Sequence, residues 1–286
     1  LTTISITINN AYGAMLEKFY INSSVIETMQ KDFYTNEMVI DNLYYTGTLE
    51  QWMQIKNPTA AFAKINNFYI QDEKIENLII PEGVTTIKPV FAKLPIKSVV
   101  LPNTLISIEK GAFADCDNLE TIVFPKSLTT IGDYAFSQCT KLVELIIPGN
   151  VTSIGEFSFL LCTSLKTVII EDGVKTIGQQ AFDSCTSLES VNIADSVETL
   201  GTGVFYQCIQ LKDIKLSNNL KELPNSLFDN CSSLQELIIP DSVEIVNENV
   251  LYNCNSLYKI VLPANLKTYN CWYPMYTINK SSVSID

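Results

Sequence analysis

Eight cysteines are the residues of this chain whose type and spacing could support chemistry. Seven of them recur at a step of 23 residues: Cys116, Cys139, Cys162, Cys185, Cys208, Cys231 and Cys254. Cysteines form disulfides, bind zinc as thiolates or act as nucleophiles beside a histidine. The chain has no histidine, which removes the usual partner of a nucleophile and the commonest metal ligand. It also lacks a spaced carboxylate pair, a Gly-rich phosphate loop and a nucleophile elbow. We therefore expect no catalysis.

The even spacing of the cysteines helps to decide between zinc binding, disulfide bonds and packing as free thiols. A line of single ligands cannot converge on a tetrahedron, so we expect no zinc and no other cofactor. If the seven cysteines stack in a column about 4.8 Å apart, neighbouring thiols would lie within reach of a disulfide. A free cysteine is also a good small core residue. We favour reduced structural thiols and keep disulfides as the alternative. Cys271 falls outside the column, and its redox state stays open.

The elements that carry the cysteines are units of an internal repeat. Residues 142–164 form one unit, and the same pattern begins again at each step of 23 residues. Units start at Ile96, Leu119, Leu142, Leu165, Leu188, Leu211, Leu234 and Leu257. Self-similarity at such a period is the signature of a solenoid, in which no unit can bury its apolar face alone. We expect about eleven rungs, two of them degenerate, with residues 73–268 as the regular part.

The pattern of each unit predicts a short strand, followed by a segment whose apolar side chains point into the core again. In the unit at Leu119, Ile122 and Phe124 share one face of a strand that Pro125 ends. Successive strands should stack into a parallel sheet. Pro125 has equivalents in most units, but three units carry another residue there, which we expect to alter the local strand length: Glu171, Ala194 and Ser217. Further along the unit, Ala135 and Phe136 predict a short helix or helical turn.

Residues 1–72 form an irregular N-terminal region. The segments 1–6 and 40–45 match the strand pattern, and residues 14–19 and 25–29 read as short helices. Thr48 and Gln51 make a capping box, which predicts a helix from Leu49 that ends before Pro58. Residues 68–70 read as a strand. Ten aromatic residues here could bind sugars or proteins, but we favour an N-terminal cap: Phe19, Tyr20, Phe33, Tyr34, Tyr44, Tyr45, Trp52, Phe62, Phe68 and Tyr69. Residues 269–286 are expected to be a C-terminal cap or the start of a further segment.

An apolar stripe should lie on the outward face of the stacked strands. By alternation, one position in each strand points away from the core: Ile79, Val100, Val123, Ile146, Ile169, Asn192, Lys215, Ile238 and Val261. An exposed apolar stripe of this length predicts a ligand groove or a contact between copies of the chain. The alternative is that β-branched residues are there because they favour strands. Our candidate binding residues are the apolar members of the stripe and Tyr258 beside it: Ile79, Val100, Val123, Ile146, Ile169, Ile238, Val261 and Tyr258.

Charge and hydropathy exclude some partners. A formal net charge of −12 argues against nucleic acid and anionic membrane surfaces. No apolar run reaches the roughly 20 residues needed to cross a bilayer, so we expect no direct membrane insertion. The chain begins at Leu1 and shows no signal peptide, so we expect a processed or truncated piece.

The unit at Leu142 resembles the BspA-like subclass of bacterial leucine-rich repeats. That pattern runs Leu-x-x-Ile-x-Ile-Pro, a small residue, then Val-Thr-x-Ile-Gly-x-x-Ala-Phe-x-x-Cys, and it covers about residues 40–268. The resemblance implies an α/β leucine-rich-repeat solenoid. This is a right-handed superhelix with a curved parallel β-sheet on its concave face and short helical or irregular turns on its convex face. Members are mostly cell-surface or secreted proteins of host-associated bacteria and some parasitic protists, with adhesion as the associated activity.

The sequence thus predicts a non-catalytic extracellular or cell-surface module that binds protein or cell-surface ligands. Weak homo-oligomerisation through the concave face is a further expectation. The alternative is a rigid spacer that presents another domain of a larger surface protein.

Overall fold

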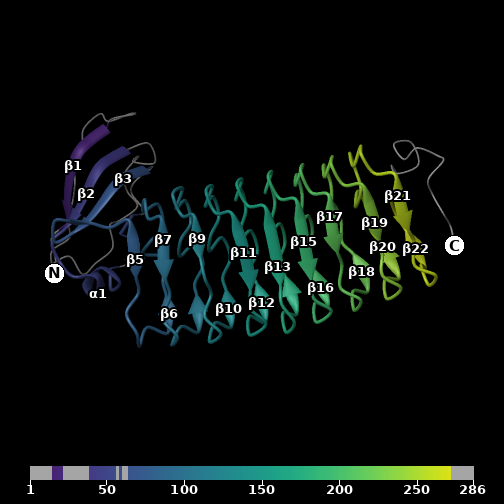
Figure 1. The fold of residues 1–286 in the computed structure, drawn as a ribbon, viewed down its shortest axis with the longest axis horizontal. Helices are drawn as coiled ribbons and strands as arrows, with labels where there is room; N and C mark the ends of the chain where they lie inside the picture. Colours follow the sequence, from purple (N-terminus) through teal and green to yellow (C-terminus); the bar gives the residue numbers. More distant parts are fainter. Residues whose placement is uncertain (1–14, 22–38, 56–57, 60–63, 272–286) are drawn as a thin grey trace.

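The computed structural model describes residues 15–21, 39–55, 58–59 and 64–271. From Asn77 onward the chain winds into a β-solenoid of stacked rungs, with a small β-sheet at the N-terminal end (Figure 1). Each rung of the solenoid contributes one strand to each of two parallel ladders. The solenoid and the parallel sheet predicted from the repeat are therefore confirmed.

The first ladder contains the strands expected from the sequence. Its register follows the repeat, so that Leu145 lies beside Val168 and Val168 beside Val191. Its strands are β5 (Asn77–Ile79), β7 (Ser98–Val100), β9 (Thr121–Ile122), β11 (Glu144–Ile147), β13 (Thr167–Ile170), β15 (Ser190–Ile193), β17 (Asp213–Lys215), β19 (Glu236–Ile238) and β21 (Lys259–Val261).

The residue at the proline position decides whether the first ladder gains one further hydrogen bond. The backbone N–H groups of Glu171 and Ala194 donate to the carbonyls of Ile147 and Ile170 at 3.0 and 3.1 Å. A proline there has no such proton. Strands β13 and β15, which Glu171 and Ala194 follow, are four residues long, but so is β11, which Pro148 follows, and β17 before Ser217 has three. The missing prolines therefore add a hydrogen bond to the ladder at Glu171 and Ala194, and their expected effect on strand length stays a prediction.

A second parallel ladder runs along another side of the solenoid and was not predicted. Each of its strands has only two residues, too few to show an alternating pattern in sequence. The strands are β6 (Thr86–Ile87), β8 (Ser107–Ile108), β10 (Thr130–Ile131), β12 (Ser153–Ile154), β14 (Thr176–Ile177), β16 (Thr199–Leu200), β18 (Glu222–Leu223), β20 (Ile245–Val246) and β22 (Thr268–Tyr269).

We call the segment that closes each rung the closing turn. Of the two forms expected for it, helical or irregular, it does not take the helical one. In the Leu119 rung, Tyr134 and Gln138 have φ of 53° and 61°, in the left-handed region. The N–H groups of Tyr134, Phe136 and Gln138 donate to carbonyls of the next rung at 2.7–2.9 Å. Because these protons bond between rungs, they cannot form the bonds of a helix within the rung. The irregular turn is the form that the structure shows.

Two columns of side chains fill the interior beside the closing turns. Seven phenylalanines stack with ring centroids 5.3–5.9 Å apart: Phe91, Phe113, Phe136, Phe159, Phe182, Phe205 and Phe228. All of them are fully buried, as are the regularly spaced cysteines apart from a trace of exposure at Cys254. Each rung therefore buries its apolar side chains against the rungs before and after it, as expected for a repeat array.

The N-terminal end carries strands β1 (Met15–Ile21), β2 (Val39–Tyr45) and β3 (Lys64–Ile70) in a parallel sheet, with the short β4 (Glu73–Lys74) antiparallel to β3. The helix predicted over residues 14–19 is wrong, because this segment is β1 and pairs with β2. The expectations for residues 1–6 and 25–29 lie outside the described residues, as do those for most of the C-terminal segment.

Helix α1 (Leu49–Trp52) begins at the predicted capping box. The Thr48 side chain accepts from the N–H of Gln51, whose side chain accepts in turn from the Thr48 N–H. The helix ends at Trp52, well before Pro58. The indole N–H of Trp52 donates to the carbonyl of Val90 at 2.9 Å and ties this region to the first regular rung.

Candidate protein-binding face

The outward side of the first ladder, here called the strand face, carries the apolar stripe. In β11, Leu145 and Ile147 are buried, whereas Ile146 between them is 55 % exposed. The pleat of a strand turns successive side chains to opposite faces, which produces this alternation. The predicted outward orientation is thus confirmed for this strand.

The predicted binding residues lie where the alternation places them, although their exposure varies. Val123 is the most exposed at 80 % and Ile169 the least of the exposed members at 37 %, while Val261 is partly buried. Ile79, Val100, Ile146 and Ile238 fall between these limits. Asn192 and Lys215 are exposed and polar, so they divide the stripe into an N-terminal part and a C-terminal part. Whether these residues bind a ligand stays a prediction.

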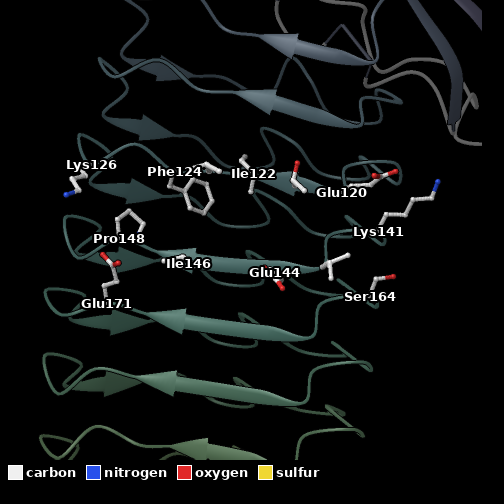
Figure 2. A pocket seen from close by; sticks show the side chains of 13 residues that line it. Glu120, Ile122, Phe124, Lys126, Lys141, Glu144, Ile146, Pro148, Ser164 and Glu171 are labelled. Atoms are coloured by element: carbon white, nitrogen blue, oxygen red, sulfur yellow. The ribbon is translucent and has the colours of Figure 1, made fainter.

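A groove of about 670 Å³ opens in the N-terminal part of the stripe, between β9 and β11 (Figure 2). We call it the first groove. The ladder is interrupted at this place, because β9 ends one sheet and β11 begins the next. Ile122 and Phe124, which point inward, keep 8 and 7 % exposure, against 1 and 0 % for Leu145 and Ile147. The groove therefore reaches down to the side chains of the core.

Phe124 sets this rung apart from the others. In every other rung the same position holds an isoleucine or a leucine: Ile80, Leu101, Ile147, Ile170, Ile193, Leu216, Ile239 and Leu262. The Phe124 ring packs edge-on against Phe136, with centroids 5.6 Å apart and an angle of 64° between the rings. A ring is larger than the aliphatic side chain that the other rungs accommodate, and extra volume in a packed interior displaces the backbone. Sequence reasoning missed the groove, although Phe124 is the one aromatic residue in its column.

The charges around the first groove differ from those elsewhere on the strand face. Glu76, Glu189 and Glu236 each pair with a lysine of the next rung, at 2.7, 3.5 and 2.9 Å. Glu120 and Glu144 border the first groove, and among the described residues no lysine lies within ion-pair distance of either. Two carboxylates beside an apolar hollow are thus left without a cation.

Lys126 and Lys141 stand at opposite ends of the first groove (Figure 2). The Lys141 ammonium donates to the side-chain carbonyl of Asn118 at 2.8 Å. At the end near Lys126, the Glu171 carboxylate accepts from the N–H of Gly149 at 3.3 Å.

A second groove, of about 700 Å³, lies where the first ladder is interrupted again between β17 and β19. Its lining mixes apolar side chains with polar and charged ones, among them Asn192, Lys215 and the predicted residue Tyr258. The Tyr258 hydroxyl donates to Glu236 at 2.7 Å. This hydrogen bond raises the pKa of Tyr258 and, together with Lys259, lowers the pKa of Glu236. The Glu236 carboxylate in the second groove is therefore already bound by neighbouring side chains of the chain itself.

The cysteines make no site of their own in the part of the chain that the structure describes. All eight are free, and no group of three or more metal-binding side chains gathers there. Burial raises the pKa of the Cys162 thiol to about 12, so the thiol stays protonated. Cys271 is half-buried, and its thiol donates to the carbonyl of Asn247 at 3.2 Å.

The N-terminal aromatic residues divide between two roles. Phe19, Tyr45, Trp52 and Phe68 are buried, as expected for a cap. Tyr20, Tyr44 and Tyr69 instead stack on the outer side of the β1–β2–β3 sheet, with centroids 4.8 and 4.5 Å apart. Phe33, Tyr34 and Phe62 lie outside the described residues. The sequence did not separate the two groups.

Within the described part of the chain, no helix has the length and apolar character that crossing a membrane requires.

Among curated proteins, no sequence matches this chain. Solved structures of similar architecture include a leucine-rich repeat protein of T. pallidum, with 28 % identity, a TM-score of 0.53 and coverage of 64 % of this chain and 78 % of that one. Another is a leucine-rich repeat protein from Eubacterium ventriosum, with 18 % identity, a TM-score of 0.52 and coverage of 80 and 73 %. A leucine rich cell surface protein from Faecalibacterium prausnitzii is 22 % identical, with a TM-score of 0.45 and coverage of 95 and 80 %.

The sequence model of the BspA type leucine rich repeat region matches residues 63–189 and 175–279, with six copies of the repeat. These residues make up well over half of the chain, and they include the columns of leucine, phenylalanine and cysteine described above. The chain belongs to the BspA-type leucine-rich repeat family.

Proposed function

We propose that this chain is a non-catalytic binding module of an extracellular or cell-surface protein, and that it contacts protein ligands through the strand face. The observation that carries the proposal is the stripe of exposed, rigidly held apolar residues from Ile79 to Ile238. Membership of a leucine-rich repeat family supports the same role. The acidic chain makes nucleic acid an unsuitable partner.

The stripe suits protein binding because its side chains are fixed before a partner arrives. They stand on strands whose backbone is bonded to the next rung and whose opposite face is buried, so little order is lost on binding. Burying apolar area contributes roughly 25 cal/mol for each Å². Exposed valine and isoleucine at neighbouring rungs offer that area on both sides of Asn192 and Lys215, and a monomer in water seldom leaves such area uncovered.

An array of purified extracellular-matrix, plasma and epithelial-surface proteins tests this function. We expect at least one immobilised protein to bind the chain, and binding to fall at least tenfold when Ile146, Ile169 and Ile238 are each replaced by Lys. Ile106→Lys is the matched control. Ile106 is similarly exposed, at 45 %, but adjoins the second ladder, so this variant should bind like the parent.

Absence of any binder above background on the array would contradict the proposal and favour the rigid spacer. Equal loss from the Ile106→Lys control would also contradict it, because the strand face would then have no special part. Light scattering on the same variants shows whether the face serves self-association instead. A dimer that Ile146→Lys dissociates would make a second copy the occupant.

A further inference from the structure

The first groove combines two features that occur together nowhere else on the described strand face. It is lined mainly by apolar groups, and the carboxylates of Glu120 and Glu144 beside it have no ion-pair partner. The second groove differs in both respects, since about half of its lining is polar and its Glu236 carboxylate is bound by Tyr258 and Lys259. Lys126 and Lys141 stand at the ends of the first groove, so a partner seated between them gains from apolar area and from a positive charge placed near Glu120 and Glu144.

We propose that the first groove binds an extended protein segment in which an apolar side chain lies two residues from a lysine or arginine. The inference rests on the proposed function and names the chemistry of the partner at one place on the strand face. The apolar side chain enters the hollow between Val123 and Ile146, and the basic side chain reaches Glu144, with Glu120 beside it.

The spacing of the proposed segment follows from the spacing of β11. Ile146 and Glu144 are two residues apart on the same outward face, which corresponds to about 6.8 Å along a strand. An extended partner presents its own side chains at the same interval. An apolar residue seated at Ile146 therefore places the residue two positions away opposite Glu144.

Charge also argues against a second copy of this chain as the occupant. Face-to-face pairing of two first grooves would bring Glu120 and Glu144 of one copy toward the same carboxylates of the other. Like charges set against one another cost association energy, and the chain as a whole carries a net charge of −12. A basic segment gains from the same field.

Synthetic twelve-residue peptides, labelled with a fluorophore and followed by anisotropy, test the proposal on the full chain. The first peptide has a central Leu with Lys two residues to each side. In three others, Glu replaces both Lys, Gln replaces both Lys, or Ser replaces the Leu. We expect the Lys–Leu peptide to bind at least tenfold tighter than the Glu–Leu and Lys–Ser peptides, with the Gln–Leu peptide between them.

Variants of the chain locate the binding. Val123→Lys should abolish binding of the Lys–Leu peptide, and the E120Q and E144Q double variant should weaken it about threefold to tenfold and reduce its salt dependence. The matched controls are Ile79→Lys, an exposed member of the stripe outside the first groove, and Glu109→Gln, an exposed carboxylate away from it. Both controls should bind like the parent.

Tight binding of the Glu–Leu peptide, or equal losses from the control variants, would overturn the proposal. So would a dimer in sedimentation that Val123→Lys dissociates. Failure of this proposal is distinguishable from failure of the proposed function. A protein on the array that loses binding with Ile169→Lys and Ile238→Lys, but not with Val123→Lys or the double variant, leaves the function standing and removes this site. An array without any binder removes both.

Discussion

The thiol of Cys162 donates a hydrogen bond to the carbonyl oxygen of Phe136, 3.3 Å away in the preceding rung. The same bond recurs along the column, from Cys139 to Phe113 at 3.3 Å and from Cys208 to Phe182 at 3.2 Å. A buried cysteine here both fills space and satisfies a backbone carbonyl at the closing turn. Serine could keep the bond but not the packing, and alanine neither.

Thiol labelling should separate Cys271 from the seven buried cysteines. With a pKa of about 12, a thiol such as Cys162 is a thiolate in only about one molecule in ten thousand at pH 8. Because all seven are also buried, we expect iodoacetamide to modify Cys271 alone in the native chain, and all eight cysteines after denaturation. Mass spectrometry of the modified peptides is the measurement. Rapid labelling of Cys162 in the native chain would show that the column is open to solvent.

Replacing Ser158 by alanine should stabilise the fold. Ser158 is fully buried and its hydroxyl has no hydrogen-bond partner, whereas the sister rungs hold Ala135 and Ala181 there. Removing an unsatisfied buried hydroxyl is expected to raise the free energy of unfolding by about 1 kcal/mol. Urea denaturation followed by circular dichroism measures it.

The control for this change is Ser184→Ala. The Ser184 hydroxyl donates to the buried Asp183 carboxylate at 2.7 Å. Losing that bond should lower the free energy of unfolding by about 1 kcal/mol. If both variants shift stability in the same direction, hydrogen bonding is not what distinguishes the two serines.

Leu161→Asn should also stabilise the chain, through the backbone. Leu161 has a φ of 59°, and Asn230 and Asn253 occupy the same position in later rungs at 63° and 57°. The left-handed conformation costs a branched apolar residue roughly 1–2 kcal/mol, and asparagine tolerates it better. We expect thermal unfolding to move upward by a few degrees. Ile209→Asn replaces a similarly exposed apolar residue outside the left-handed region and should give no gain.

Phe124→Ile should close the first groove. In the regular intervals the N–H groups of Ile80 and Ile239, in the column of Ile147, donate to the next rung at 3.0 Å. Because direction alternates along a parallel strand, the N–H groups of Glu144 and Ile146 are the ones that point back toward β9. With an aliphatic side chain at 124, we expect β9 and β11 to pair and these two amides to exchange more slowly with deuterium. Ile170→Phe is the reciprocal change, and it should weaken the pairing of β13 with a neighbouring strand. Unchanged amide exchange in Phe124→Ile would show that the Phe124 ring is not the cause of the groove.

Glu76 gives the chain a contribution to stability that depends on pH. Hydrogen bonds and ion pairs from Lys74 at 2.8 Å and Lys97 at 2.7 Å lower the pKa of Glu76 from 4.5 to about 2. A lowered folded-state pKa gives stability that is present above the unfolded value and lost as the pH falls toward the folded value. We expect parent and Glu76→Gln to differ in free energy of unfolding above pH 4.5 and to converge between pH 4.5 and 2. A difference that stays constant over this range would contradict the coupling.

The sequence predicts the stacking of the rungs well, because each position of the repeat can be compared across many units. The inward Leu145, the outward Ile146 and the buried Phe159 all follow from columns read down the units. Single occurrences have no such support. Residues 14–19 have strong helix formers at helical spacing, yet they form β1, because pairing in register with β2 outweighs a weak local propensity.

The candidate site also depends on a feature that occurs once in the sequence and was therefore not predicted. Alternation could place Val123 outward, but it could not show that the strand next to it is unpaired. The sequence marks this place only through the single ring in its column, Phe124. The closing turn was also ambiguous, because Ala135 and Phe136 suit a helix while the left-handed Tyr134 and Gln138 are visible only in the backbone.

The hydrogen bonds between rungs run along the length of the solenoid, and this gives the chain a mechanical character. A pull on the two ends would load the rungs in series, so they would open one at a time, starting where a neighbour is missing or a ladder is interrupted. Each opened rung of 23 residues would release at most about 80 Å of extended chain. It would also uncover one cysteine that had been inaccessible at rest. Stretching the array would therefore uncover its buried thiols one after another, so that the number exposed follows the extension of the chain.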